Sequence, residues 1–380
     1  MPKRYLMTPG PTPVPPEVLA AIAQPIVHHR TPDFRPVYER VLTRLGEIFR
    51  TRQDVLMFPS SGSGAMDSVL ANLGGRGRRA LVVSAGYFGE RWGQIAAAHE
   101  CDVEWVRYEW GETPTADDVR ARLEELGGAD IVLLTQSETS TGVVCDIRAL
   151  AEVAREAGAL VAVDAVSSLG ALPLEMDAWG LDAVASGSQK ALMTPPGLGF
   201  VSVSERGWSA RGAPRSFYFD WERTRKAQAS LDAPYTPPVS LVAGLDVALG
   251  LLLDEGLEAV FERHVRLGRA CRAGAKAMGL ELFSPDEDRS AVVTAVYAPD
   301  GVDSGDVVKA LRDRFGITIA NGQGDLKGRI FRLGHIGWFD IFDITTTLAA
   351  VELALAEAGA DIERGVAVTR ALETFEHTHV

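Results

Sequence analysis

Two hydrophobic patterns alternate along the chain between residues 54 and 203. Short continuous apolar runs are typical of strands buried on both faces, and apolar residues that recur every three or four positions are typical of helices. Strands are predicted at 54–58, 80–84, 103–106, 131–134, 160–163, 181–185 and 199–203. Helices are predicted at 65–73, 88–98, 115–126 and 147–157. This alternation predicts an α/β fold with a mainly parallel sheet that is covered on both faces.

The pattern differs outside this alternating region. Prolines between Thr8 and Pro16 remove amide donors and predict an extended N-terminal arm. Residues 211–238 lack a regular pattern and are predicted to form a long loop. A helical stretch at 239–278 is weakly interrupted at Gly256. The remaining elements predicted are helices at 17–24, 33–49, 304–315 and 341–358 and strands at 280–283, 291–297, 317–320 and 329–333. We therefore expect an arm (1–16), a large domain (17–255) and a smaller α+β C-terminal domain (256–380).

Composition excludes several classes of protein. The 380 residues carry a net charge of −13, which disfavours a nucleic acid or an anionic membrane surface as a partner. No apolar run approaches the roughly 20 residues of a membrane span, and the first residues lack the apolar segment of a signal peptide. Cys101, Cys145 and Cys271 are few and far apart, which predicts neither a disulfide framework nor a metal site. We expect a soluble cytoplasmic enzyme.

A lysine and an aspartate follow two of the predicted strands. Asp164 ends the strand at 160–163, and Lys190 follows the strand at 181–185 within Ser-Gly-Ser-Gln-Lys. The carboxyl ends of parallel strands line the ligand crevice of an open α/β sheet. A lysine that forms an imine and an anion that faces the pyridinium nitrogen are what pyridoxal phosphate requires. Either residue alone is more often a surface lysine or a helix cap.

Further polar and aromatic residues follow other predicted strands. Ser61, Gly62 and Ser63 precede a helix, where free amides and hydroxyls favour an anion such as a monophosphate. Phe88 could stack on a flat ring, although an aromatic residue there is more often part of the core. Thr139 could hold a phenolic oxygen or bond to the local backbone instead. Arg332 offers a planar fork for a carboxylate, with a surface ion pair as the alternative.

Three motifs taken together strongly resemble class V aminotransferases. They are Ser-Gly-Ser-Gln-Lys-Ala at 186–191 with Pro-Pro-Gly beyond it, Val-Asp-Ala-Val-Ser-Ser-Leu-Gly at 163–170, and Ser-Gly-Ser-Gly-Ala-Met-Asp at 61–67. The resemblance runs from Thr8 to His335 and is greatest to the alanine–glyoxylate and serine–glyoxylate (serine–pyruvate) group. It implies a PLP-dependent transferase fold of type I, a homodimer with shared active sites, and ping-pong transfer of an amino group from alanine or serine to glyoxylate or pyruvate.

The resemblance also implies roles for individual residues. Lys190 resembles the Schiff-base lysine and Asp164 the partner of the pyridinium nitrogen. The other positions match as follows: Ser61, Gly62, Ser63 and Gln189 bind the cofactor phosphate, Thr139 lies near the phenolic oxygen, Thr236 reaches the phosphate from the partner subunit, and Arg332 binds the substrate carboxylate. Phe88 is a departure, because relatives often carry a stacking tryptophan there. The sequence assigns no role to His29, Arg30 or His335.

Other functions remain open on the same fold. Enzymes that use aspartate or ureidoglycine as the amino donor share the same motifs. A lyase or decarboxylase differs only in which bond to the substrate Cα breaks. A cysteine desulfurase needs a nucleophilic cysteine near the substrate, and the three cysteines lie away from the motifs. A non-catalytic binding protein on this fold is disfavoured, because Lys190, Asp164 and Arg332 are retained.

Overall fold

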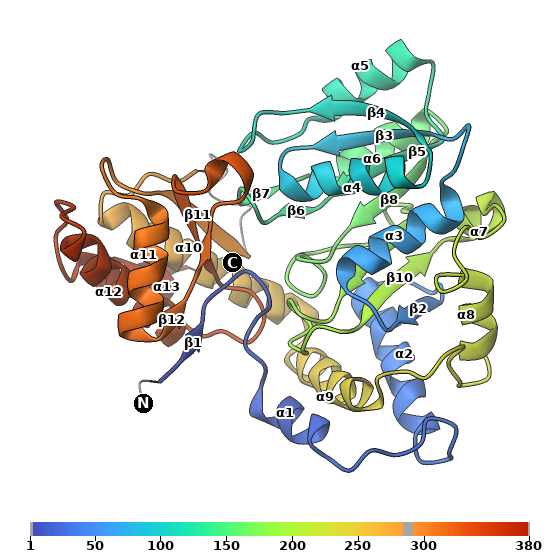
Figure 1. Cartoon of the computed structure of the whole chain (residues 1–380), viewed down its shortest axis with the longest axis horizontal. Coiled ribbons are helices and arrows are strands. Elements are labelled where there is room, and N and C mark those ends of the chain that lie inside the picture. Colours follow the sequence, from blue (N-terminus) through green and yellow to red (C-terminus); the bar gives the residue numbers. More distant parts are fainter. Residues whose placement is uncertain (1–2, 284–291, 379–380) are drawn as a thin grey trace.

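The computed structural model describes residues 3–283 and 292–378. A large α/β part is built around a seven-stranded sheet, and a smaller part contains a three-stranded sheet with helices beside it (Figure 1). The long helices α9 (Val239–Glu255) and α10 (Leu257–Ala277) join the two parts. Gly256 separates them, with a φ of 87° that favours glycine. This architecture confirms the predicted fold class.

The central sheet is mainly parallel, as predicted. Its order is β2-β10-β9-β8-β5-β3-β4, and β10 is the strand that runs against both of its neighbours. The strands are β2 (Val55–Phe58), β3 (Arg79–Ser84), β4 (Asp102–Arg107), β5 (Ile131–Thr135), β8 (Leu160–Asp164), β9 (Ala183–Gly187) and β10 (Gly199–Val203). Most of these strands are buried on both faces, which explains why they appear in the sequence as continuous apolar runs.

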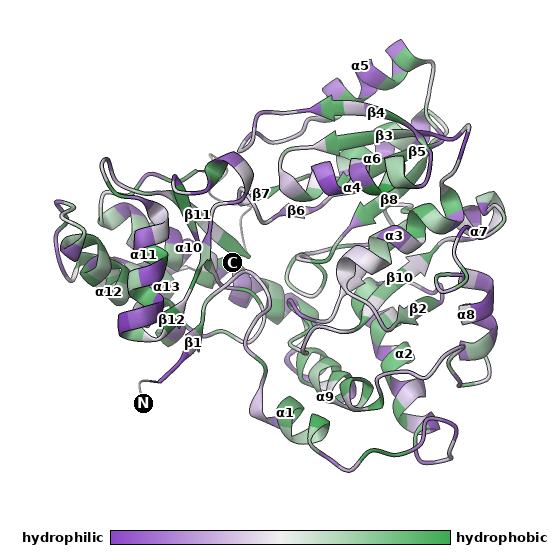
Figure 2. Ribbon diagram, viewed as in Figure 1, coloured by the Kyte–Doolittle hydropathy of each residue, from purple (hydrophilic) through white to green (hydrophobic). Residues whose placement is uncertain are grey.

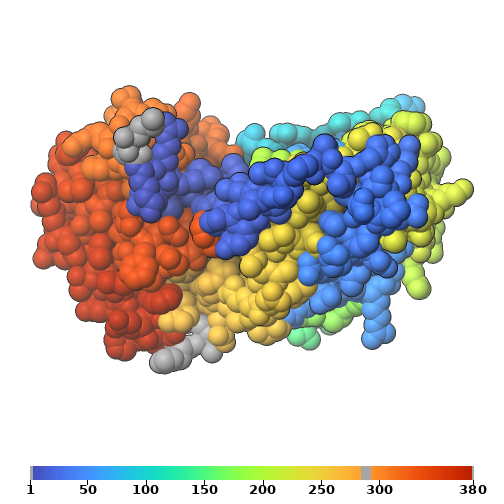
Figure 3. Space-filling view, turned by 90° about the horizontal axis from the view of Figure 1, so that it is seen from below, coloured from blue at the N-terminus to red at the C-terminus, as the bar shows by residue number. Residues whose placement is uncertain are grey.

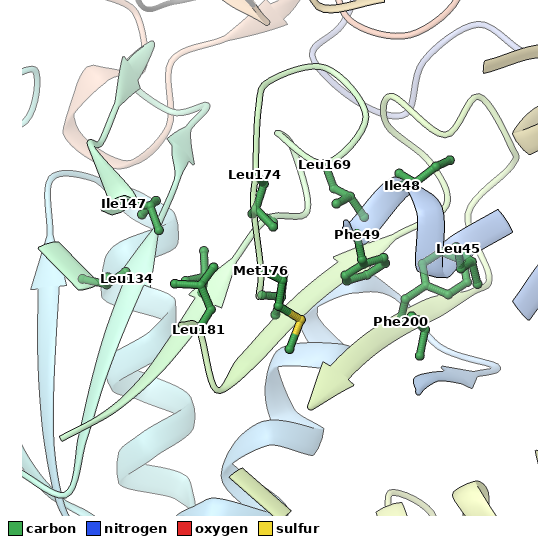
Figure 4. Packing of buried hydrophobic residues seen from close by; sticks show 14 of the residues in the cluster. Leu45, Ile48, Phe49, Leu134, Ile147, Leu169, Leu174, Met176, Leu181 and Phe200 are labelled. Atoms are coloured by element: carbon green, nitrogen blue, oxygen red, sulfur yellow. The ribbon is translucent and has the colours of Figure 1, made fainter. Parts of the chain in front are cut away.

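Successive residues of each strand enter two different cores. In β5, Ile131 and Leu133 pack against one face with α3 (Gly62–Leu73) and α4 (Tyr87–Ala98). Val132 and Leu134 pack against the other face with α2 (Arg35–Phe49), α5 (Ala116–Leu126), α6 (Ile147–Glu156) and α9. Figure 4 shows part of this second core, with Phe49, Met176 and Phe200 among the labelled residues. Because β5, β8 and β9 are parallel and packed between the two cores, their carboxyl ends lie at the same edge of the sheet.

The helices of the large part turn their apolar sides toward the sheet. Polar colour is concentrated on the outward sides of α5 and of α8 (Trp221–Gln228), and the central strands are mostly apolar (Figure 2). The shorter elements of this part are α1 (Pro16–Ile22), α7 (Glu205–Ala210) and the strand pair β6 (Ser137–Glu138) and β7 (Val143–Val144). Within the described ranges, no helix has the length and apolarity needed to cross a membrane.

The smaller part has a core of its own. Its antiparallel sheet has the order β11-β14-β13, with β11 (Val293–Tyr297), β14 (Ile330–Gly334) and β13 (Ala320–Asn321). The later half of α10 packs there with α12 (Ile341–Glu357) and α13 (Val366–His377). The first turn of α10 belongs to the large core instead, through Leu257 and Val260. The other helical segments are α11 (Ser304–Ala310), a π-turn (Leu311–Phe315) and a 3-10 turn (Gly324–Leu326).

The N-terminal arm connects the two parts. Its strand β1 (Tyr5–Leu6) pairs with β12 (Ile317–Thr318) of the smaller part, and the chain then crosses to α1 on the large part. Figure 3 shows this segment lying across both parts on one face of the molecule. Gly334 lies under the arm, because a Cβ there would be 2.4 Å from the carbonyl of Thr8. From Lys3 to Pro15 the arm contains no helix, and it includes the short edge strand β1.

Several predicted elements were wrong. The loop predicted at 211–238 contains α8, whose N-cap Asp220 accepts hydrogen bonds from the amides of Glu222 and Arg223. Leu282 forms an isolated bridge to Val296 rather than part of a strand at 280–283. The first residue of the strand predicted at 291–297 lies outside the described residues. Helices α7 and α13 were not predicted.

Candidate active site

The strand ends bring Lys190 and Asp164 to the same edge of the sheet. Strands β8 and β9 are parallel neighbours, with Asp164 opposite Ala185, and Lys190 follows β9. Both side chains line one cavity of about 250 Å³. Its lining is Gly10, Pro11, Ser61, Ser63, Met66, Phe88, Arg91, Ser137, Asp164, Val166, Ser167, Gln189, Lys190 and Pro196. A larger hollow of about 1020 Å³ between α10 and α13 contains none of the predicted site residues.

The Lys190 amine is buried against the N-terminal arm. Its Nζ donates a hydrogen bond of 2.6 Å to the carbonyl oxygen of Pro9, and 9% of the residue is exposed. The pKa of Lys190 is lowered to about 8, mainly by burial and in part by Arg332 and Arg91, and Asp164 opposes this fall. An amine that loses its proton near neutral pH is suited to nucleophilic attack and proton transfer.

The Asp164 carboxyl lies beside this amine. Its Oδ1 accepts a hydrogen bond from the amide of Val166 at 2.9 Å. Burial, with a contribution from the nearby Glu138 carboxyl, raises the pKa of Asp164 to about 6, and the Val166 amide, Lys190 and Arg91 oppose this rise. A cationic ring nitrogen at this carboxyl would stabilise its ionised form.

The predicted phosphate seat lies at the start of α3. Ser61 is the N-cap of this helix, and its Oγ accepts a hydrogen bond from the amide of Gly64 at 3.4 Å. Ser61 and Ser63 line the cavity. Gly62 lies behind them, where a Cβ would be 2.5 Å from Val166. Gln189 lies opposite, next to Lys190 in the chain, and lines the same cavity.

Phe88 and Thr139 have different relations to the cavity. Phe88 lies in the first turn of α4 and lines the cavity, as a ring that stacks on a cofactor must. Thr139 is buried but is not part of the lining. Its backbone carbonyl accepts a hydrogen bond of 2.7 Å from Arg332 Nη1. The role predicted for its hydroxyl stays a prediction.

Arg332 lies in the middle of β14, within the strand predicted at 329–333. Its Nε and Nη2 both donate to the carbonyl oxygen of Asn321, at 3.0 and 2.7 Å, and Nη1 reaches Gln323 Oε1 at 3.3 Å. Burial lowers the pKa of this guanidinium to about 10. With the bond to Thr139, these contacts hold the guanidinium between the small and large parts, close enough to Lys190 to lower the pKa of its amine.

The remaining predicted residues lie away from the cavity. Thr236 is exposed and is not part of the lining of its own chain's cavity. Three arginines outside the cavity lining form ion pairs: Arg30 with Asp232, Arg215 with Glu100, and Arg225 with Asp54.

Two buried histidines have no part in the cavity lining. His29 stacks on His28, with ring centroids 4.6 Å apart. His335 Nε2 is hydrogen-bonded to Thr294 Oγ1 at 2.9 Å.

Sequence reasoning missed several residues of the cavity lining, and two of them, Arg91 and Ser137, are polar side chains on elements next to the sheet. Arg91 Nη1 donates a hydrogen bond of 2.8 Å to Ser63 Oγ, and its guanidinium lies 4.8 Å from the Phe88 ring centroid. Ser137, in β6, also lines the cavity. Arg91 stands three positions after Phe88, the helical spacing of side chains on one face, so the sequence did contain a signal for it.

The class V aminotransferase family model matches residues 4–326, most of the chain and all of the predicted motifs except that of Arg332. The chain belongs to the class V aminotransferases. A 42 kDa subunit of a soluble hydrogenase from Anabaena cylindrica is 42% identical over 99% of both chains. The L-aspartate–glyoxylate aminotransferase of Paracoccus denitrificans is 35% identical over 98% of this chain and 96% of that one.

A solved structure of similar fold is the ureidoglycine–glyoxylate aminotransferase of Bacillus subtilis. It is 32% identical, covers 99% of both chains and has a TM-score of 0.93. Further relatives of this chain are named serine–glyoxylate aminotransferases, and an alanine–glyoxylate aminotransferase is among the similar structures. These comparisons confirm the predicted family, fold and cofactor. The names of the similar proteins include several different amino donors.

The cavity residues fit pyridoxal phosphate. Gln189 Oε1 and Ser137 Oγ are buried and have no hydrogen-bond partner among the described residues. Both atoms belong to residues that line the cavity. Buried polar atoms are rarely left without a partner, so a bound polar ligand accounts for them. The hydroxyls and amides at the start of α3 suit the phosphate, and Lys190 and Asp164 suit the aldehyde and the ring nitrogen.

Proposed function

We propose that this enzyme transfers the amino group of alanine or serine to glyoxylate in a ping-pong reaction. Arg332 carries this proposal, because it lies on the small-domain side of Lys190 and can hold the carboxylate that every amino acid has. Arg30, Arg215 and Arg225 are engaged elsewhere, which supports a pocket without a further clamp for a distal carboxylate. Glyoxylate is a substrate in the names of several relatives.

The site residues have separate tasks in this reaction. When bound, pyridoxal phosphate supplies an aldehyde that accepts the amino group and a ring that takes up electrons. Lys190 Nζ removes the proton from the substrate Cα and returns it on the cofactor side. Asp164 would keep the ring nitrogen protonated. Ser61, Ser63 and Gln189 would hold the phosphate, and Phe88 would stack on the ring.

A second candidate is an aspartate donor, as in the relative from Paracoccus denitrificans. Arg91 favours it, because this cation lines the same cavity. The contact of Arg91 with Ser63 places the guanidinium at the phosphate seat instead of the substrate side. We therefore give alanine or serine precedence.

A panel of amino acids tests these donors. Alanine, serine, aspartate and glutamate are assayed with glyoxylate, pyruvate and 2-oxoglutarate, and kcat/KM is compared. We expect alanine or serine with glyoxylate to give the highest value and 2-oxoglutarate to be a poor acceptor. Equal values for 2-oxoglutarate and glyoxylate would contradict the small pocket, and aspartate as the best donor would select the second candidate.

The assignment of Lys190 has its own test. Borohydride reduction of the native holoenzyme followed by peptide mapping is expected to place the cofactor on Lys190, and on no lysine in Lys190→Ala. Cofactor found on another lysine would overturn the assignment. We also propose a cytoplasmic homodimer in which Thr236 reaches the site of the neighbouring subunit.

A further inference from the structure

Glu138 is a buried carboxyl beside the active site to which neither the sequence motifs nor the proposed reaction gives a task. It ends β6, immediately before Thr139, and 1% of it is exposed. Its Oε2 accepts hydrogen bonds from the amides of Phe88 at 2.9 Å and Gly89 at 3.0 Å. These amides belong to the first turn of α4, about fifty positions earlier in the chain.

Ser140 completes this contact. Its Oγ donates to Glu138 Oε1 at 2.6 Å and accepts from the amide of Tyr87 at 3.0 Å. The N-cap of α4 is Gly86, which has no side chain to cap the helix. Glu138 and Ser140 therefore satisfy the first three amides of α4, which otherwise have no partner within the helix.

Gly86 shows how closely these groups are packed. A Cβ at this position would lie 2.5 Å from Glu138 Cγ and 2.6 Å from Ser140 Oγ. The backbone of Gly86 is extended, with a φ of 168°, which any residue adopts. Glycine is needed here for space alone, so that the carboxyl can reach the helix.

The hydrogen bonds indicate the charge of Glu138. Burial raises the pKa of this carboxyl, whereas Ser140 and the amides of Gly89, Ser140 and Phe88 lower it. Three backbone amides, those of Phe88, Gly89 and Ser140, point at the two carboxyl oxygens, and an amide N–H can only donate. An anion at the N-terminus of a helix is further stabilised by the helix dipole. The geometry fits the ionised form.

The segment 138–140 contacts both walls of the site. On one side Glu138 and Ser140 hold the turn of α4 that carries Phe88, and Arg91 follows on the same helix and contacts Ser63. On the other side the carbonyl of Thr139 holds Arg332 at 2.7 Å. A shift of this segment would therefore move the stacking ring and the substrate arginine together.

We propose that Glu138 is a positioning residue that holds Phe88 and the start of α4 at the angle the cofactor needs. The inference depends on the proposed role of Phe88 as the stacking ring. It assigns Glu138 no contact with substrate or cofactor. Its charge also raises the pKa of Asp164 and of Arg332 directly. The proposed positioning effect passes through the backbone amides of α4 to the ring and to Arg91.

Glu138→Gln tests this proposal, because the amide has the same size but replaces one acceptor oxygen with a donor. Glu352→Gln is a matched control. Glu352 is also buried and accepts hydrogen bonds from the amides of Gly365 at 2.8 Å and Ala367 at 2.9 Å at the start of α13. Each substitution weakens a cap that a distant carboxyl provides for a helix. Glu138 lies beside the cofactor cavity, and Glu352 does not.

The readouts are the dissociation constant of pyridoxal phosphate, the visible circular dichroism of the bound cofactor, and the melting temperature. We expect both variants to melt earlier than the wild type. The dissociation constant should rise roughly tenfold in Glu138→Gln, the scale of one lost hydrogen bond to a charged group, with a weaker dichroic band. Glu352→Gln should stay within about twofold of the wild type, a difference below 0.5 kcal/mol.

Two further variants keep the test decisive if Glu138→Gln does not fold. Ser140→Ala and Gly86→Ala should, like Glu138→Gln, weaken the dichroic band and raise the dissociation constant of pyridoxal phosphate. Unchanged cofactor binding in whichever of the three variants fold would overturn the role of Glu138. Failure of the wild type to bind pyridoxal phosphate would instead overturn the proposed function.

Discussion

Gly10 of the N-terminal arm lies directly against the side chain of Lys190. A Cβ at Gly10 would be 2.3 Å from Lys190 Nζ, and the preceding residue, Pro9, accepts the hydrogen bond from that amine. The contact continues beyond Gly10, where Thr12 Oγ1 donates to the carbonyl oxygen of Lys190 at 2.9 Å. The arm is therefore a wall of the active site as well as a connection between the two parts of the molecule.

Gly10→Ala is expected to displace the amine of Lys190. The new methyl group has no space, and the φ of +140° at this position strains any residue other than glycine. We expect kcat/KM to fall roughly 100-fold, the scale for a displacement of about 1 Å in a reacting group. Gly212→Ala is the control, because a Cβ there meets nothing within 4 Å. Equal activity of the two variants would show that the arm does not position Lys190.

The buried amine of Lys190 predicts a pH dependence of stability in the cofactor-free protein. Its pKa is lowered from 10.5 to about 8 in the folded state. Between these values the unfolded chain binds a proton that the folded chain has released, so the free energy of unfolding rises with pH. The full effect is on the order of 3 kcal/mol.

Lys190→Met isolates this effect from other groups. Burial raises the pKa of Cys271 to about 11, which produces the opposite slope in the same range. Because Cys271 is present in both proteins, the difference between wild type and Lys190→Met reports on Lys190. Urea unfolding at about pH 7.5 and about pH 10 should show the wild type gaining more stability than the variant. A difference that does not change with pH would mean that the amine stays protonated.

The sequence was sufficient to predict which residues at the ends of strands line the site. Asp164 and Lys190 follow continuous apolar runs, and the carboxyl ends of parallel strands must meet at one edge. The same logic placed Ser61 and Phe88 at the cavity. Arg91 was missed although it lies three positions after Phe88 in a predicted helix, because its contact with Ser63 joins residues 28 positions apart.

The sequence was insufficient where tertiary contacts define an element. Helix α8 has an almost entirely polar sequence, so its buried Trp221 and Thr224 form no apolar stripe. Asp220 was a usable N-cap signal, but the prolines of the surrounding segment obscured it. The contact between Arg332 and Thr139 joins residues 193 positions apart, which no local pattern encodes.

The position of Thr236 leads us to predict that the active site is shared between two subunits. It is exposed and does not line its own chain's cavity, and Phe217 in the same region exposes 70% of its surface. Thr236→Ala should therefore weaken binding of pyridoxal phosphate, and the protein should be a dimer by light scattering.

Mixing two variants distinguishes a shared site from a local one. Lys190→Ala lacks the reactive amine but keeps Thr236, and Thr236→Ala keeps the amine. A mixed dimer should contain one complete site and regain tight cofactor binding. No recovery after subunit exchange, or a fully active monomer, would show that Thr236 does not act across an interface.

Arg332→Lys tests the substrate clamp and separates charge from geometry. Lysine keeps the positive charge but loses the planar fork, and it cannot reproduce the contacts that hold Arg332 to Asn321 and Thr139. Binding of every amino acid and oxo acid should weaken by roughly 2–3 kcal/mol, the scale of hydrogen bonds to a charged group.

Arg329→Lys is the matched control for this prediction. Arg329 lies three positions earlier in the same segment and is exposed, so its replacement should leave the kinetics unchanged. The loss in Arg332→Lys should appear mainly in KM for all substrates, because each carries the same carboxylate. The visible absorption of the bound cofactor should persist, since the phosphate seat and Lys190 are intact. Wild-type kinetics in Arg332→Lys would show that the carboxylate binds elsewhere, and a loss confined to one substrate would assign Arg332 to side-chain recognition.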